Sequence, residues 1–174
     1  MADGDSREEA NAPPVYRGPV VLVLVAFRLA LGALFLSVWG SNLDKGLYDP
    51  EPYANLIDFY ADEGDAPGVW KEVMRVVADN SGVAAPLQLV GELALGVLLV
   101  LGLATRVAGV AAGLFLTALW VSEIGVPDEW AWSLVFPALA AFAVALLSAG
   151  RYYGLDGVLL ARPPFDRLPR WATG

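Results

Sequence analysis

Residues 87–106 read LQLVGELALGVLLVLGLATR. The stretch from Leu87 to Ala104 is almost entirely apolar, but Glu92 interrupts it about a third of the way along. A helix needs roughly 17–25 residues to cross the hydrocarbon core of a bilayer, and this run is long enough. A charge at that depth is costly unless it has a partner or a wet cavity, so the fold must supply one for Glu92.

Three further apolar runs accompany this one, so that the four cover about 18–39, 84–104, 107–124 and 131–149. Of the 174 residues, 57% are hydrophobic, and the mean hydropathy is +0.55. Soluble domains of this length rarely reach that value, because they need a charged surface. None of the runs alternates polar and apolar residues as barrel strands do. The sequence predicts an all-α integral membrane four-helix bundle.

The predicted membrane domain covers residues 18–160 and lies between two polar segments. Residues 1–17 form an acidic segment that we expect to be disordered, and residues 161–174 form a tail rich in proline and arginine. A signal peptide begins with a positively charged region, and the segment before the first run is acidic. We therefore expect the first run to be a retained helix.

The basic residues divide unevenly between the two sides of the predicted bundle. Three lie on one side, namely Lys45, Lys71 and Arg75. Seven lie on the other: Arg7, Arg17, Arg106, Arg151, Arg162, Arg167 and Arg170. The positive-inside rule then predicts a multi-pass protein of the cell membrane with both termini in the cytoplasm. Twelve acidic against three basic residues give the outer side a net charge of −9. The whole chain has 19 acidic residues and a pI of about 4.4, which indicates either a salt-adapted organism, such as a halophilic archaeon, or a locally acidic outer face.

The outer loop, 40–83, contains two short amphipathic patterns. The first begins at Pro50 and places Tyr53, Leu56, Ile57 and Tyr60 on one helix face. The second covers Gly68–Ala78, and we expect Asp65 to cap its N-terminus. The two helices either shield the helix ends or lie on lipid headgroups, or they cover a cavity or bind a partner.

The chain has no cysteine and no histidine. These absences exclude thiol redox chemistry, disulfides, thiolate metal sites and histidine-ligated haem for this chain alone. We therefore expect no haem, Fe–S cluster or structural metal. No glycine-rich nucleotide loop is present, and we expect no nucleic-acid partner.

Arg28, in the first apolar run, is the predicted partner of Glu92. At about 1.5 Å per residue, Arg28 lies about 16 Å above Arg17 and Glu92 about 21 Å above Arg106. Helices joined by a connection are usually neighbours, so an arginine side chain could bridge the difference. The pair would either fix the helix register or line a proton, quinone or anion site.

Three blocks of residues carry a resemblance to a known family. They are RLALG (28–32) with Phe35, Gly40 and Lys45; GE (91–92) with Gly96 and LGLATR (101–106); and GRYYGLD (150–156). On these blocks, which cover roughly residues 20–160, the chain resembles the DoxX/DoxD superfamily of small four-helix membrane proteins. Its extended outer loop resembles the DoxD branch, named for a subunit of thiosulfate:quinone oxidoreductase. We expect Asp156, in the third block, to cap a short helix over Asp156–Leu160.

The resemblance implies a membrane subunit of quinone-linked, sulfur-compound oxidoreductase chemistry that acts with a redox partner subunit. Quinone would be the cofactor, and the candidate ligand-lining residues are Trp39, Lys45, Gln88 and Trp120 beside the Arg28–Glu92 pair. No catalytic residue is assigned, and whether the chain is an enzyme stays open. The alternative is a non-catalytic membrane scaffold, assembly factor or envelope-integrity module. Lipid is an expected contact in either case, and both a monomer and an oligomer are compatible with the sequence.

Overall fold

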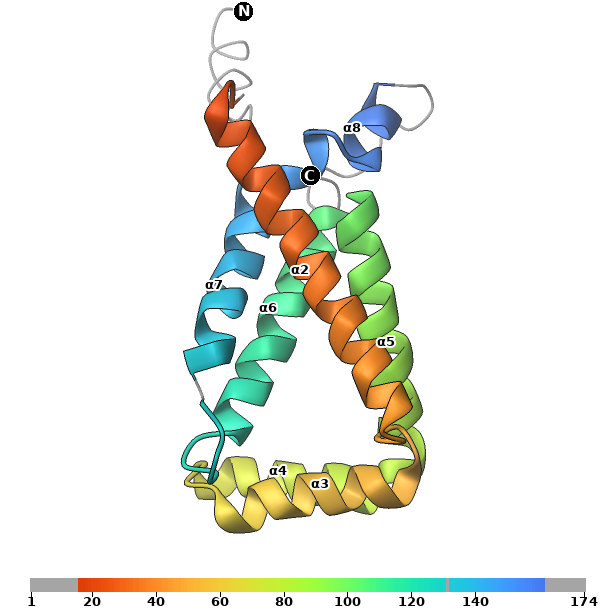
Figure 1. Ribbon diagram of the computed structural model, residues 1–174, viewed down its shortest axis with the longest axis vertical. Coiled ribbons are helices and arrows are strands. Elements are labelled where there is room, and N and C mark those ends of the chain that lie inside the picture. The colour runs from red at the N-terminus through yellow and green to blue at the C-terminus, as the bar shows by residue number, and fades with distance from the viewer. Residues whose placement is uncertain (1–15, 131, 162–174) are drawn as a thin grey trace, which may run out of the picture.

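The computed structural model describes residues 16–130 and 132–161. Over these residues the chain is helical, without strands, and four helices form a bundle: α2 (Pro19–Asp44), α5 (Ser81–Leu101), α6 (Thr105–Ser122) and α7 (Trp132–Leu146) (Figure 1). Helices α3 (Pro50–Glu63) and α4 (Gly68–Asp79) lie across one end of the bundle, here called the α3–α4 end. The turn η1 (Ala149–Arg151) and helix α8 (Leu155–Leu160) lie at the opposite end, here called the α8 end.

Three of the bundle helices, α2, α5 and α6, are long and apolar enough to cross a membrane. Helix α7 is equally apolar but has 15 residues, so it is shorter than the predicted span 131–149. The other predicted spans agree within five residues at each end, since α2 runs on to Asp44 and α5 begins at Ser81. The predicted disordered segment before residue 16 and the tail from residue 162 lie outside the described residues.

The bundle is built from two closely packed helix pairs, α2 with α5 and α6 with α7. Glycines allow the close approach in both pairs. A Cβ atom at Gly32 would lie 2.9 Å from the Val100 backbone nitrogen, and one at Gly109 would lie 2.9 Å from the Ala141 carbonyl oxygen. Small residues are favoured at helix contacts in membranes because apolar burial drives little association there. The GxxxG spacing of Gly109 and Gly113 therefore serves packing inside the molecule.

The two predicted amphipathic helices are confirmed as α3 and α4, which turn Tyr53, Ala61, Met74 and Ala78 into the interior. The predicted cap of α4 is wrong. The residue before α4 is Pro67, and no side chain caps the helix. Asp65 is too far upstream of Gly68 to cap it, and its backbone N–H instead donates to the Ile124 carbonyl (2.5 Å) in the α6–α7 loop.

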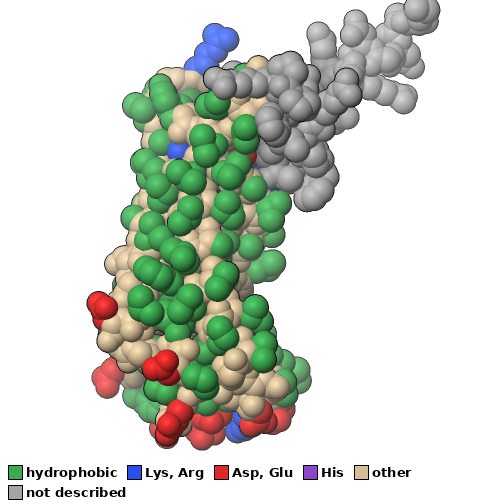
Figure 2. Space-filling view, turned by 90° about the vertical axis from the view of Figure 1, so that its right-hand side faces the viewer, with side chains coloured by type: hydrophobic (Ala, Val, Ile, Leu, Met, Phe, Trp, Pro, Cys, Tyr) green, Lys and Arg blue, Asp and Glu red, His purple; other side chains and the backbone are tan. Residues whose placement is uncertain are grey.

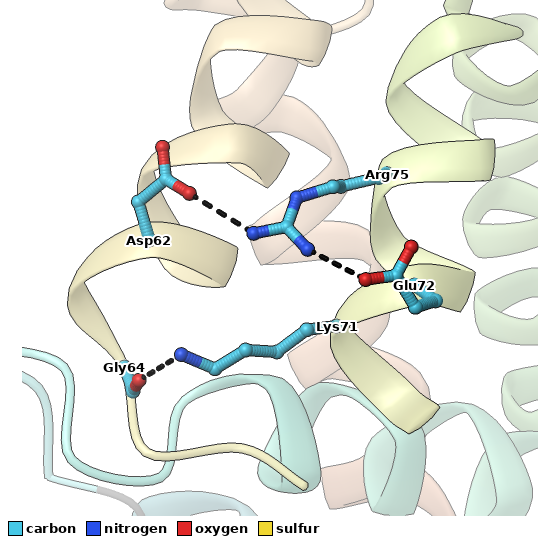
Figure 3. Close-up of polar contacts among 5 residues, drawn as sticks. All are labelled: Asp62, Gly64, Lys71, Glu72 and Arg75. Carbon is cyan, nitrogen blue, oxygen red and sulfur yellow. Dashed lines mark hydrogen bonds and ion pairs between the residues drawn. The ribbon is translucent and has the colours of Figure 1, made fainter. Parts of the chain in front are cut away.

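Polar contacts join α3 to α4 on their solvent side (Figure 3). Lys71 Nζ donates to the Gly64 carbonyl (2.6 Å), which ties α4 to the end of α3. Arg75 contacts Asp62 at 3.4 Å and Glu72 at 2.9 Å. The side chains of Arg75, Asp62 and Glu72 are all well exposed, so these ion pairs add at most about 1 kcal/mol to stability.

The kinds of side chain on the surface differ along the length of the molecule. Hydrophobic side chains cover the middle of the bundle in Figure 2, and acidic side chains gather at the α3–α4 end. The face in Figure 2 thus has an apolar middle suited to lipid and one strongly acidic end.

Candidate functional site

The two charges buried in the bundle do not form the ion pair that the sequence predicts. Arg28 and Glu92 are 1% and 2% exposed, but their hydrogen bonds go to opposite ends of the bundle. Side chains on a helix lean toward its N-terminus. Helix α2 begins at the α8 end and α5 begins at the α3–α4 end, so the two side chains diverge. The rise per residue along each helix gives the depth of the Cα atom but not the direction in which the side chain leans.

Arg28 binds backbone carbonyls at the α8 end. Its guanidinium donates to the carbonyl oxygens of Ala149 (3.2 Å), Tyr152 (3.2 Å) and Tyr153 (3.1 Å). A guanidinium has five donors in a fixed plane, which suits several carbonyls around one turn. Asp156 lies close enough to interact electrostatically with Arg28. Arg28 thus fixes the segment after α7 against α2.

Asp156 caps a different helix from the one predicted. It is the second residue of α8, but its carboxylate accepts hydrogen bonds from the backbone N–H groups of Ala104 (2.7 Å) and Thr105 (2.9 Å). These groups lie at the N-terminus of α6, where a carboxylate also interacts favourably with the helix dipole. The predicted cap of the segment Asp156–Leu160 is therefore wrong, and Asp156 connects α8 to the α5–α6 turn.

Two glycines make room for Arg28 in this arrangement. Gly102 ends α5 in the left-handed conformation (φ 65°), and a Cβ atom there would lie 2.8 Å from the guanidinium carbon of Arg28. A Cβ atom at Gly154 would lie 3.0 Å from the Gly102 carbonyl oxygen. All three sequence blocks that carry the family resemblance therefore contribute to the α8 end, where Arg28, residues 101–106 and residues 150–156 meet.

Glu92 is held by a network of hydrogen bonds near the α3–α4 end. Tyr48 donates its hydroxyl to Oε2 (2.5 Å), and the Gln88 amide donates to Oε1 (2.7 Å). Tyr53, on α3, donates in turn to the Gln88 side-chain carbonyl (2.8 Å). Burial and the contact with Glu92 raise the pKa of Tyr48 above its usual range, so this phenol remains a donor. Tyr48 and Tyr53, from the segment that crosses the end of the bundle, thus help to satisfy the hydrogen bonds of the Glu92 carboxylate.

An apolar cavity of about 190 Å³ lies between the two helix pairs, next to this network. Glu92 forms part of its wall. The other lining residues are Leu34, Phe35 and Val38 of α2; Phe115, Leu116 and Leu119 of α6; Leu134 of α7; and Glu123. The cavity therefore combines hydrophobic walls with two carboxyl groups, from α5 and from the end of α6. Ligand sites are typically apolar with a few placed polar groups, as here.

A groove on the lipid-facing side reaches the same part of the bundle. It has a volume of about 340 Å³ and runs between α2 and α7, along Phe27, Leu31, Phe136 and Pro137. Leu34 lines both the groove and the cavity. An apolar chain lying in this groove would have its inner end at the cavity.

Glu123 is the cavity residue that sequence reasoning missed. It follows directly after α6 and is half-buried. Burial, together with the nearby charge of Glu129, raises the pKa of Glu123 to about 7. The signal for it in the sequence was weak, because an acidic residue at the end of an apolar run looks like an ordinary helix end.

Of the predicted ligand-lining residues, the structure brings only Gln88 to Glu92. Trp39 and Trp120 are not among the residues that line the cavity. Trp39 Nε1 is buried without a hydrogen-bond partner in the described part of the chain. Lys45 is exposed at the end of α2.

A family model described as "TQO small subunit DoxD" matches residues 23–164, which is most of the chain. The chain belongs to the DoxD family. This family is one of membrane subunits of the quinone-linked oxidoreductase type. No curated protein and no solved structure matches the chain. Within residues 16–130 and 132–161, no three acidic side chains are grouped so that they could hold a metal ion.

Proposed function

We propose that this DoxD-family protein is the quinone-binding membrane subunit of an oxidoreductase, with the quinone ring in the cavity between Glu92 and Glu123. The observation that carries the proposal is the cavity itself, which has apolar walls, two carboxyl groups and a neighbouring apolar groove. A quinone has the matching form, since it combines a flat ring bearing two carbonyl oxygens with an apolar tail.

The sizes of the two spaces support a ring and a tail in separate places. Sites that enclose a drug-sized ligand are typically about 300–1,000 Å³. At about 190 Å³, the cavity is suited to a single small headgroup. The groove between α2 and α7 is larger and faces lipid, so an isoprenoid tail would lie along Leu31 and Phe136.

A bound quinone accepts two electrons and two protons when it is reduced. The residues around the cavity supply hydrogen bonds and exclude water from the ring. Gln88 and Tyr48 hold Glu92 in one position, so the carboxyl group has a fixed direction at the wall. No electron-carrying group is expected in the chain itself, so electrons would come from a partner subunit or from the substrate.

A sulfur compound is the finer proposal for that substrate. Thiosulfate is an anion, and the acidic α3–α4 end repels anions at low salt. High salt would screen most of this repulsion. A partner subunit that docks on the α3–α4 end and delivers the sulfur compound would avoid this repulsion.

We further propose that the α8 end faces the cytoplasm. Arg17, Arg106 and Arg151 lie at this end, whereas the described residues of the α3–α4 end are strongly acidic. The positive-inside rule favours that orientation in the cell membrane.

The second candidate function is a non-catalytic membrane scaffold. The exposed side of α4 favours it, because Val69 and Val76 are 83% and 61% exposed within a layer that otherwise bears acidic groups. Purification from native membranes in mild detergent distinguishes the two functions, since a structural partner without quinone would indicate the scaffold.

Quinone binding by the purified protein tests the main proposal. A short-chain naphthoquinone and a short-chain benzoquinone are titrated into the protein in detergent, and bound probe is measured by ultrafiltration. Saturable binding of about one quinone per chain is expected. Failure of both probes to bind above the level of empty micelles would overturn the proposal.

A further inference from the structure

The geometry points to Glu123 as the group that binds the quinone carbonyl, donating a hydrogen bond in its protonated form and exchanging that proton with the α3–α4 end. This inference rests on the proposed quinone site and names the residue that makes its binding depend on pH.

The two carboxyl groups of the cavity differ in their surroundings. Both oxygens of Glu92 already accept hydrogen bonds, from Tyr48 and Gln88. Glu92 is thereby fixed as an acceptor within the network. A quinone carbonyl oxygen accepts hydrogen bonds, so it needs a donor. Glu123 is the other titratable group of the cavity wall, and it becomes a donor when it is protonated.

Glu123 also has a route to the aqueous side. It follows the last residue of α6 and opens the loop that leads to Glu129, which is exposed. Tyr60 of α3 donates its hydroxyl to Glu129 (2.8 Å), which connects this loop to the α3–α4 layer. Glu123 thus lies where the cavity wall meets a loop whose Glu129 is exposed at the α3–α4 end.

The charged groups around Glu123 come from every element near it. On its own loop are Glu129 and the exposed Asp128, and across the cavity on α5 is Glu92. The segment between α3 and α4 contributes Asp65, whose N–H binds the Ile124 carbonyl, and α4 contributes Lys71, whose ammonium binds the neighbouring Gly64. Helix α3 contributes Tyr60, and α7 has no titratable side chain. Burial is the larger cause that favours the protonated form of Glu123, and the charge of Glu129 adds to it.

The direction of the pH effect follows from the pKa of Glu123. Because this pKa is about 7 in the folded protein, the carboxyl group is protonated and can donate below pH 7. Above pH 7 it becomes a carboxylate and repels the carbonyl oxygen. Quinone affinity should therefore be highest in weak acid and should fall as the pH rises through 7, by up to tenfold per pH unit well above the pKa.

The test measures the affinity for the short-chain naphthoquinone between pH 5 and pH 9. Glu123→Gln keeps a hydrogen-bond donor at every pH, so its affinity should stay flat across the range. Glu123→Ala should bind weakly throughout. Glu129→Gln leaves the burial of Glu123 in place but removes the nearby charge that adds to it, so the fall in affinity should move to lower pH.

The matched control is Asp128→Asn, an exposed change of charge in the same loop. Asp128 has a left-handed backbone (φ 65°), which asparagine also adopts readily. This variant should keep the wild-type pH profile. Infrared difference spectra give a second readout, since the protonated carboxyl band perturbed by quinone binding should disappear in Glu123→Gln.

The outcomes separate this inference from the proposed function. If the wild type binds no quinone at any pH, the proposed function fails. If the wild type binds quinone and Glu123→Gln shows the same fall near pH 7, then Glu123 is not the donor and this inference is overturned while the quinone site stands.

Discussion

Arg28 leans toward the α8 end and Glu92 toward the α3–α4 end, because α2 and α5 run in opposite directions and side chains lean toward the start of their helix. Each charge has its own set of partners as a result. Arg28 binds three backbone carbonyls, and Glu92 accepts from a phenol and an amide. Arg28 therefore has a structural role, whereas Glu92 borders the cavity.

A double-mutant cycle tests the separation of the two charges. Arg28→Gln and Glu92→Gln should each lower the free energy of unfolding by about 1–3 kcal/mol, because each leaves buried partners unsatisfied. The effects should add within about 0.5 kcal/mol, as they do for distant sites. The free energies are measured by denaturing the protein in mixed micelles. A coupling energy well above about 0.5 kcal/mol would indicate that Arg28 and Glu92 do pair directly. Rescue of folding by exchanging the two residues would indicate the same.

At the scale of elements, glycines decide how closely each helix pair can pack. Gly109 of α6 faces α7, where an added Cβ atom would lie 2.9 Å from both the Ala141 carbonyl oxygen and the Ala145 Cβ. Gly91 of α5 has no atom within 4 Å of the same position. Two glycines in apolar helices therefore have opposite roles, and only the one at Gly109 is required by packing.

Alanine at these two positions gives a matched comparison. Gly109→Ala should destabilise the protein by about 1–3 kcal/mol, because α6 and α7 must move apart. Gly91→Ala should be neutral or stabilise it by up to about 1 kcal/mol, since alanine favours the helix. Thermal unfolding in detergent measures both changes. Equal losses in the two variants would show that α6 and α7 are not in close contact at Gly109.

At the scale of the whole molecule, the bundle has an acidic end covered by α3 and α4 and an end closed by η1 and α8. The chain has no cysteine, so single cysteines can report its orientation in the membrane. We expect Val69→Cys, at the α3–α4 end, to react with a membrane-impermeant maleimide in intact cells. Ala161→Cys, at the α8 end, should react only after the cells are permeabilised. The reverse pattern would place the acidic end in the cytoplasm.

The sequence was sufficient for the parts of the fold that local pattern determines. Apolar run length predicted the bundle helices, and the helical periodicity after Pro50 and from Gly68 predicted α3 and α4. The partners of Arg28 could not be predicted, because they are backbone carbonyls more than a hundred residues away that become acceptors only once the chain turns at η1. Tyr48 and Glu123 were missed for a similar reason, since only the tertiary fold brings them to Glu92 and the cavity.

The central claim is that the quinone lies in the cavity, and a pair of tryptophan variants in α6 tests it most directly. Leu119 lines the cavity, and Leu114 faces outward with 60% of its surface exposed. The measurement is the affinity of each variant for the short-chain naphthoquinone at pH 6. Leu119→Trp fills the cavity and should weaken binding at least tenfold, whereas Leu114→Trp should leave it unchanged. Equal affinity in the two variants and the wild type would contradict the account.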